Sequence, residues 1–451
     1  MSFSKGLNIN RKRKFLTLNT QRRLLVAITL LGLFLRTAYV WLAFDESMLV
    51  YHRGDWPEYR IAAEAVMAGD WEFRHSHFLV RPPLFPILAA AVSADESTVI
   101  VINMILACAI VPMTYALARA LGLSARLSLA AAFFVAIDLT SIKYSGVLLA
   151  EPLANLLLVA AFVSLGLQQR AEGRRQVALA ALLCSVFTAL SALTRPAGFL
   201  VWIPMALWTF MSRERLRELA VLGVIVPAAL VVVLWSAHNL AYFGNFTFST
   251  IGTFNLVYYR AASVHHVAHG RPGIALTYVE LARRIEERLG SDASDIDQWR
   301  RYHHRTPNAT QAAAMTDVAL EVFASHPLEY LLTIPAGLFR TLVWLGNGGL
   351  WLGVVWNLAL LSACALGARE LWLRRNWSML AFLILPCLYF ITGTMLVQSS
   401  GIDSRARVMV TPLMAVLAAI MLADWRLSLV CREAISRFSR VWNVDSMGLS
   451  R

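Results

Sequence analysis

Charged residues stand at the ends of long apolar runs in this 451-residue chain, and their types suit proton transfer and anion binding. Asp55 and Glu58 follow the first apolar run in GDWPEY, and Glu151 opens a later run in LLAEPL. A carboxylate in this position can take a proton from a hydroxyl group. Arg195 in LTRPAGF and Arg405 in DSRAR lie at other run ends, and guanidinium groups bind phosphate oxygens through paired hydrogen bonds.

Arginine and lysine are also present where the outer side of a membrane protein is expected, and this is unusual because Lys and Arg collect on the cytoplasmic side. The further cations in this position are Arg81, Lys143 and Arg407. Several outer cations beside carboxylates call for an anionic partner, such as a lipid headgroup. An ordinary surface ion pair, for example Asp403 with Arg405, remains an alternative.

The carboxylates have simple structural explanations too. Asp55 as N-cap, Pro57 near the helix start and Glu58 three residues after Asp55 together predict a capping box, with a helical apolar stripe behind it. Glu151 beside Pro152 could serve as a partner for the helix dipole. These explanations stay open beside a role in chemistry.

The composition indicates a helical membrane protein. Hydrophobic residues make up 58% of the chain and charged residues 15%, against about 25% charged in ordinary soluble domains. Apolar runs near the length of a membrane-spanning helix recur along the chain. The first run is too long for a signal-peptide core, so we expect it to remain as the first span. The five cysteines form no pattern typical of disulfides or zinc.

The positive-inside rule predicts an all-α polytopic fold with about ten crossings and both ends cytoplasmic. The expected spans are 24–44, 98–118, 127–142, 149–167, 176–193, 197–211, 218–237, 349–368, 378–397 and 406–423. The expected domains are a cytoplasmic tail (1–23), an N-terminal transmembrane module (24–237) with a catalytic first outer loop (45–97), an outer-face domain (238–348), C-terminal spans (349–425) and a cytoplasmic tail (426–451).

Two segments should lie on the outer face of the membrane as interfacial helices. The loop 45–97 is expected to form two interfacial helices that border a groove at the membrane surface. The segment 326–346 is read as an interfacial helix, because a crossing there would place two basic clusters outside.

Nucleic acid and metal are not expected. The net charge of +13 comes from short clusters at span ends, which the topology explains. Histidines are grouped in VHHVAHG and in RYHHR. In the first group His266 and His269 lie three residues apart, but no accompanying carboxylate motif indicates a zinc site. We therefore expect no cofactor, with a divalent metal as the minor alternative.

Several blocks together resemble the bacterial GT-C glycosyltransferases, in the family 39 group of protein mannosyltransferases and aminoarabinose transferases. In chain order they are GDWPEY with RPPLFP, LLAEPL, LTRPAGFL, HNLAYFGNFTFSTIGTFNL and SRARVMVTPLMAV, between about residues 24 and 425. The resemblance implies an inverting enzyme of the bacterial inner membrane. It would move a sugar from a polyprenyl-phosphate donor to an envelope glycan, glycolipid or protein at the outer, periplasmic face.

The resemblance also assigns roles. Asp55 matches the family's acidic residue in the first outer loop, Glu151 the acidic residue at the fourth span, and Arg405 the arginine before the last span. The family usually has Arg-Tyr where Ala406 follows Arg405, so Arg407 is an alternative contact for the donor phosphate. Other expected phosphate contacts are Arg81, Lys143 and Arg195, and expected acceptor or sugar contacts are Glu58, Tyr59, His238 and Asn239.

Two other functions remain compatible with the sequence. A lipid or glycolipid transporter or flippase would place ionisable groups or broken helices near the middle of the membrane. A structural assembly subunit would not need Asp55, Glu151 and Arg405 to converge. Neither the sugar nor the acceptor follows from these motifs, because the shape of the pocket selects both.

Overall fold

The computed structural model describes residues 16–43, 55–213, 215–270, 273–297, 300–345, 350–398 and 404–423. All regular structure in these residues is helical, which confirms the predicted all-α polytopic fold class. The predicted tails 1–23 and 426–451 lie largely or wholly outside the described residues, as do Asp403 and Cys431.

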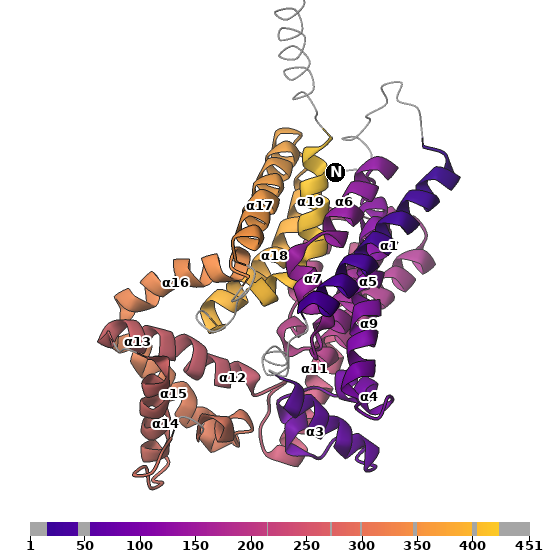
Figure 1. Ribbon diagram of the computed structural model, residues 1–451. Helices are drawn as coiled ribbons and strands as arrows, with labels where there is room; N and C mark the ends of the chain where they lie inside the picture. The colour runs from indigo at the N-terminus through magenta and orange to yellow at the C-terminus, as the bar shows by residue number, and fades with distance from the viewer. Residues whose placement is uncertain are drawn as a thin grey trace, which may run out of the picture.

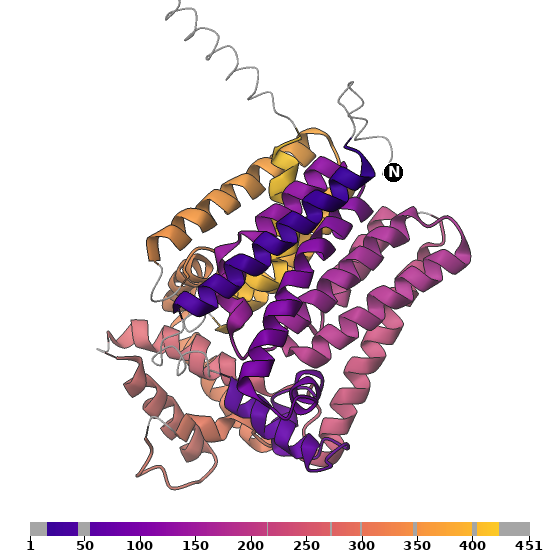
Figure 2. The ribbon, with the colours of Figure 1, turned by 45° about the vertical axis from the view of Figure 1, so that its right-hand side comes forward.

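Seven helices among the described residues are long and apolar enough to cross a membrane. They are α1 (Leu18–Ala43), α5 (Glu96–Ala120), α8 (Glu151–Arg170), α9 (Arg174–Thr194), α11 (Arg217–Phe243), α17 (Leu350–Leu373) and α18 (Trp377–Gln398). Figure 2 shows the long helices packed side by side as a bundle. The protein is therefore a multi-pass membrane protein by the length and composition of its helices.

The remaining predicted spans correspond to shorter or broken helices. They are the pair α6 (Ala125–Ala136) and α7 (Leu139–Lys143), the pair η4 (Pro196–Gly198) and α10 (Trp202–Ser212), and η7 (Ser404–Val410) followed by α19 (Thr411–Met421). The chain bends by 48° between α6 and the segment that starts with α7, and this pair counts as an eighth candidate span. Asp138 lies at the bend. Its carboxylate accepts a hydrogen bond from the amide of Ser141 at 2.9 Å and so caps the N-terminus of α7.

Helix α19 lies at the centre of the bundle. All ten residues of Thr411–Ile420 are buried, so the helix is apolar on every side, as an enclosed helix must be. It packs on α17 and α6. A Cβ atom at Gly367 of α17 would collide with the carbonyl of Leu417, so only glycine permits this approach of the two backbones.

The described part of the predicted first outer loop folds onto one end of the bundle. Its helices are α3 (Trp56–Met67), η2 (Ser76–Leu79, a 3₁₀ turn) and α4 (Leu84–Ala90). Trp56, Tyr59 and Phe85 are buried against Val99 and Ile100 of α5. Figure 1 shows α3 and α4 at the bottom, while the described start of α1 and the end of α19 lie at the top.

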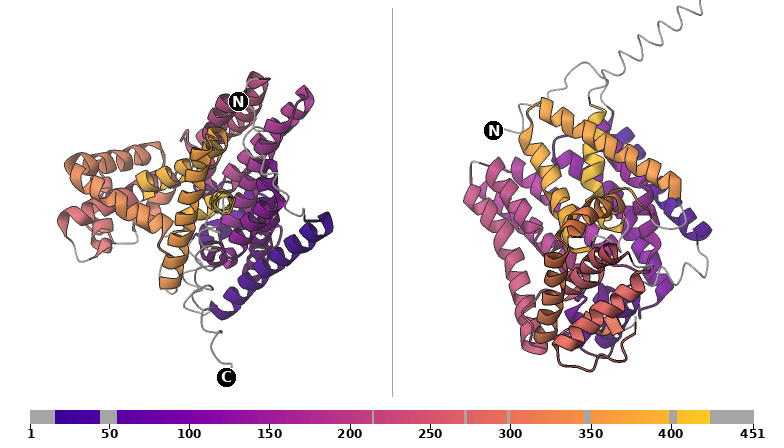
Figure 3. Two further views of the ribbon diagram at one scale, coloured as in Figure 1. Left: turned by 90° about the horizontal axis from the view of Figure 1, so that it is seen from above. Right: turned by 90° about the vertical axis from the view of Figure 1, so that its left-hand side faces the viewer.

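The segment after α11 forms a separate small core. Its elements are α12 (Ile251–Asn255), the π-helix η5 (Leu256–Ala261), α13 (Ala262–His269), α14 (Ile274–Arg288), η6 (Arg300–Arg305) and α15 (Ala309–Ser325). Phe254, Tyr258, Leu281 and Val318 contribute to this core. We call α12 to α15 the lateral unit, because seen from above in Figure 3 it lies to one side of the bundle.

Helix α16 (Pro327–Leu342) follows the lateral unit and does not run alongside α17 in Figure 1, but across it. Leu328, Leu331, Leu332 and Phe339 are exposed on this helix. Its predicted position in the membrane interface stays a prediction.

A buried polar network holds η7 inside the bundle. Arg407 donates to Asp138 at 3.0 Å and to Asn357 of α17 at 2.8 Å, and it also binds Thr140. Trp356 donates to the same Asp138 oxygen at 2.9 Å. Arg407 and Asp138 are fully buried, so each charge depends on the other.

We expect Arg407→Met to lower stability strongly, because it leaves Asp138 as a buried charge without its partner, at a cost of about 3–5 kcal/mol. The apparent melting temperature of purified protein in detergent measures the effect. The double variant Asp138→Asn with Arg407→Met should recover part of the loss. Arg60→Ala is the matched control, since its pair with Glu64 is exposed and worth at most about 1 kcal/mol. Equal melting temperatures for Arg407→Met and Arg60→Ala would contradict this role of the network.

Candidate active site

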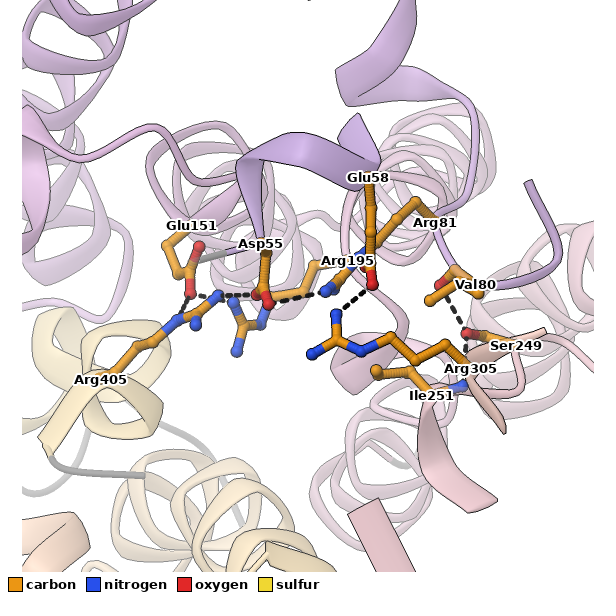
Figure 4. Close-up of polar contacts among 10 residues, drawn as sticks. All are labelled: Asp55, Glu58, Val80, Arg81, Glu151, Arg195, Ser249, Ile251, Arg305 and Arg405. Carbon is orange, nitrogen blue, oxygen red and sulfur yellow. Dashed lines mark hydrogen bonds and ion pairs between the residues drawn. The ribbon is translucent and has the colours of Figure 1, made fainter. Parts of the chain in front are cut away.

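Seven charged side chains form a continuous chain of ion pairs at the end of the bundle, with arginine and carboxylate alternating (Figure 4). In order they are Arg195, Glu151, Arg405, Asp55, Arg81, Glu58 and Arg305. We call this set the ion-pair chain. It joins four segments that are far apart in the sequence: the first outer loop, the α8–α9 region, η6 and η7.

Asp55 is at the middle of the ion-pair chain. Its Oδ1 lies 2.8 Å from Nη2 of Arg81, and its Oδ2 accepts a hydrogen bond from Nη2 of Arg405 at 2.6 Å. Asp55 occupies the N-cap position of α3, but its side chain makes no capping hydrogen bond. The predicted capping box with Glu58 is therefore wrong, because both carboxylates bind arginines instead of the helix amides.

Arg81 bridges Asp55, at the N-cap of α3, and Glu58 in its first turn. Its Nε donates to Glu58 at 2.6 Å, and only 6% of its side chain is exposed. The guanidinium carbon lies 4.9 Å from the centre of the Tyr59 ring, which supports it from one face. The loop that carries Arg81 is fixed in turn by residues that precede the lateral unit: Ser249 donates to the carbonyl of Val80 at 2.8 Å, as Figure 4 shows.

Glu151 and Arg195 extend the chain toward the bundle. Glu151 is the first residue of α8, and Arg195 follows the last residue of α9, so the packing of these two helices brings the side chains together. One oxygen of Glu151 accepts a hydrogen bond from Arg405 and forms an ion pair with Arg195. Its other oxygen, Oε2, is buried without a hydrogen-bond partner among the described residues.

Arg405 reaches the site from η7. Arg407, two residues later, is anchored in the buried network around Asp138, and this fixes the direction of η7. The two arginines therefore have different surroundings: Arg405 contacts Asp55 and Glu151 and is 17% exposed, while Arg407 is fully buried.

Arg305 was not singled out from the sequence. It lies at the end of η6, binds Glu58 and stacks 4.8 Å from the ring centre of Phe254. Thr250 donates to the carbonyl of Arg305 at 2.7 Å and its own amide binds Leu79 at 3.0 Å. An arginine in an expected outer segment was the available signal, the same one that pointed to Arg81.

Other predicted contacts lie outside the ion-pair chain. Lys143 binds the carbonyl of Leu345. His238 binds the carbonyl of Glu72 at 2.8 Å, and the buried Asn239 binds the carbonyl of Thr247 at 2.8 Å. These residues hold loops together in the structure, and their predicted roles in ligand binding stay predictions.

The electrostatics of the site favour the charged forms. Burial alone would raise the pKa of Asp55, but the charges of Arg81, Arg405 and Arg305 outweigh burial and hold this pKa well below its usual value. The ion-pair chain has four guanidinium groups and three carboxylates, so it carries one excess positive charge. A site of this kind suits an anion with one negative charge.

The histidines are used for packing within the lateral unit. His304 lies 2.9 Å from Glu286 and 2.5 Å from the hydroxyl of Tyr258. Burial lowers the pKa of the His304 imidazole. His269 stacks on His265 with ring centres 4.0 Å apart. In the part of the chain that the structure describes, no three His, Cys, Asp or Glu residues are grouped so that they could hold a metal ion.

Two comparisons with known proteins agree on the fold. The family model for dolichyl-phosphate-mannose–protein mannosyltransferases matches residues 89–236, about a third of the chain. Against curated proteins the sequence has no significant match.

Three solved structures of the oligosaccharyltransferase of Archaeoglobus fulgidus are similar in fold. The archaeal AglB in complex with an inhibitory peptide and a dolichol-phosphate has a TM-score of 0.51 and 14% identity, over 95% of this chain and 52% of that one. The form tethered to an acceptor peptide has a TM-score of 0.51 and 14% identity, over 91% of this chain and 50% of that one. The complex with Zn and sulfate has a TM-score of 0.50 and 15% identity, over 94% of this chain and 51% of that one.

The chain thus spans about half the length of the oligosaccharyltransferase it matches. The family model and the fold together confirm the predicted resemblance to the GT-C glycosyltransferases.

The low pKa of Asp55 predicts sensitivity to acid. Its folded pKa lies below the unfolded value of about 3.9, so its ionisation contributes stability that is present above pH 4 and is lost as pH falls toward the folded pKa. Melting temperatures between pH 7 and pH 3 should fall less steeply for Asp55→Asn than for the parent. The control Glu72→Gln, an exposed carboxylate of the same loop, should follow the parent. Parallel curves for Asp55→Asn and the parent would contradict this assignment.

Proposed function

We propose that this GT-C-type membrane protein is an inverting glycosyltransferase that moves a sugar from a polyprenyl-phosphate donor to an envelope glycan, glycolipid or protein. The observation that carries the proposal is the contact between Asp55 and Arg405, which joins a proton acceptor to a phosphate-binding group at the ends of membrane-spanning helices. The family resemblance and the GT-C fold support the same class of enzyme.

Asp55 is the proposed general base. The acceptor hydroxyl gives its proton to Asp55 while its oxygen attacks the anomeric carbon, and the bond from that carbon to the phosphate oxygen breaks. The electron pair leaves with the phosphate, and a single displacement of this kind inverts the anomeric carbon. The exposed part of Asp55, 19% of its side chain, gives access to an acceptor.

Arg405 is the proposed contact for the leaving phosphate, with Arg81 and Arg195 beside it in the ion-pair chain. Fixed guanidinium groups stabilise charge that develops on a leaving group without reorganising. Glu151 holds Arg405 and Arg195 in place.

The donor class is proposed from the surroundings of the site. A polyprenyl chain needs an apolar medium, and the long apolar helices α8, α9 and α18 lead to the ends where Glu151, Arg195 and η7 meet. The solved AglB contains a dolichol-phosphate and a peptide. We propose a site at the outer face of the bacterial inner membrane, on the sequence-based topology.

Arginines take the place of a metal in this proposal. The excess positive charge of the ion-pair chain opposes the binding of a divalent cation. The proposed cofactor requirement is therefore none.

A transporter is the weaker alternative. Arg36 in α1 is an ionisable residue within a span, as a transporter would require, but it is fully buried and donates to the carbonyls of Gly32, Val135 and Ala136 at 3.0–3.3 Å. It thereby ties α1 to the end of α6, which is a structural role. The buried pair of Asp138 and Arg407 is likewise fixed in a network.

We expect Asp55→Asn to lower transfer by about 10²-fold or more, the scale of lost general-base help. Initial rates with a synthetic polyprenyl-phosphate sugar in detergent, where no vesicle separates two compartments, measure transfer without transport. Glu72→Gln is the matched control and should retain the parent rate. A well-folded Asp55→Asn protein with the parent rate would mean that Asp55 is not the base.

Arg405→Lys should lower turnover by about 10- to 100-fold and Arg405→Ala further, because loss of a charge-assisted hydrogen bond costs about 1.5–3 kcal/mol. Lysine keeps the charge but not the forked geometry. The same rate assay checks this, with Arg60→Lys as the control on an exposed pair. If both Arg405 variants turn over like the parent, the phosphate is bound elsewhere, and Arg81 and Arg195 become the candidates.

A further inference from the structure

We infer that Asp55 and the donor phosphate compete for the same nitrogen of Arg405, and that Arg405 passes from one anion to the other. This inference rests on the proposed function and adds an order of events to it. Asp55 then has two roles: it binds Arg405 in place of the phosphate, and it acts as the base.

The contacts of Arg405 allow such an exchange. Its Nε binds Glu151, whose side chain is fully buried, and its Nη2 binds Asp55, whose side chain is 19% exposed. Of the two carboxylates that bind Arg405, only Asp55 is therefore partly exposed. A phosphate that enters the site would compete with Asp55 for Nη2, while Glu151 keeps the arginine in position.

The charges allow a phosphate to bind while Asp55 remains ionised in the site. The ion-pair chain carries one excess positive charge, and a sugar phosphodiester carries one negative charge, so the occupied site is neutral. In the structure, Asp55 forms ion pairs with both Arg81 and Arg405. A bound phosphate competes for Arg405 and leaves Asp55 with Arg81.

The exchange removes a conflict in the chemistry. Burial raises the pKa of Asp55, but three arginines outweigh burial and hold this pKa low, and a carboxylate with a low pKa is a weak base. Loss of its contact with Arg405 raises its proton affinity when the donor is present. During transfer Asp55 gains the acceptor proton and loses its charge, while the leaving phosphate gains one negative charge. Arg405 stands between the two groups, and the total charge of the site does not change.

A permanent structural clamp would behave differently. If the contact between Asp55 and Arg405 only held η7 against α3, removal of the carboxylate would loosen the site and would not improve phosphate binding. If Asp55 acted only by general repulsion of anions, its removal would improve binding whether or not Arg405 is present. The exchange requires that the improvement depend on Arg405.

Binding of farnesyl phosphate, a short polyprenyl monophosphate, to the detergent-solubilised protein tests this by a double-mutant cycle. Isothermal titration calorimetry gives the dissociation constants of the parent, Asp55→Asn, Arg405→Gln and the double variant. We expect Asp55→Asn to bind about tenfold more tightly than the parent. We expect the same substitution in the Arg405→Gln background to change the affinity less than twofold. Asp55→Ser serves as a second variant, and Glu72→Gln should bind like the parent.

An affinity of Asp55→Asn and Asp55→Ser equal to or below that of the parent would overturn the inference, and so would an equal gain in the Arg405→Gln background. Farnesol, which lacks the phosphate, should not distinguish the variants, and a preference for Asp55→Asn there would also overturn it. Transfer assays on the same preparations report separately on the proposed function. An active parent with no gain in Asp55→Asn rejects the exchange alone, whereas an inactive parent with the expected cycle rejects the transferase alone.

Discussion

The two hydrogen bonds of Arg405, to Asp55 and to Glu151, connect parts of the protein that the sequence separates by 350 and 254 residues. Buried ion pairs stabilise a structure only when every charge has its partners, because the desolvation of each charge is otherwise unopposed. The ends of α3, α8, α9, η6 and η7 must therefore meet within hydrogen-bonding distance of one another. The helix packing of the bundle serves this requirement.

Much of the site could be predicted because its residues stand where topology makes them unusual. Asp55, Glu151, Arg195 and Arg405 all flank apolar runs, and the structure brings all four into contact. The fold class followed from the apolar runs themselves. Arg305 could not be distinguished in the same way, because it lies in a long polar segment where arginine is common and no span end marks its position.

Other features depend on three-dimensional context that sequence patterns do not contain. The pattern of Asp55, Pro57 and Glu58 is that of a capping box, but two nearby arginines compete successfully for the carboxylates. The choice between Arg405 and Arg407 likewise depends on Asp138, which lies more than 200 residues away and is buried beside Arg407. Helix length alone identifies seven or eight spans among the described residues, and an enclosed helix such as α19 need not have full membrane length, so the predicted count of about ten stays a prediction.

The complete burial of α19 bears on how the protein is made. A helix with no lipid-facing side gains little from entering the bilayer alone, and its neighbours α6 and α17 are synthesised before it. Because Gly367 has no side chain, the backbone of α19 packs directly against the backbone of α17. Arg405 precedes α19, so it is the last of the seven residues of the ion-pair chain to be synthesised. By then Asp55 and Glu151 already have Arg81 and Arg195 as partners, and Arg405 connects these two pairs. Membrane insertion of the final hairpin and completion of the ion-pair chain are therefore one event.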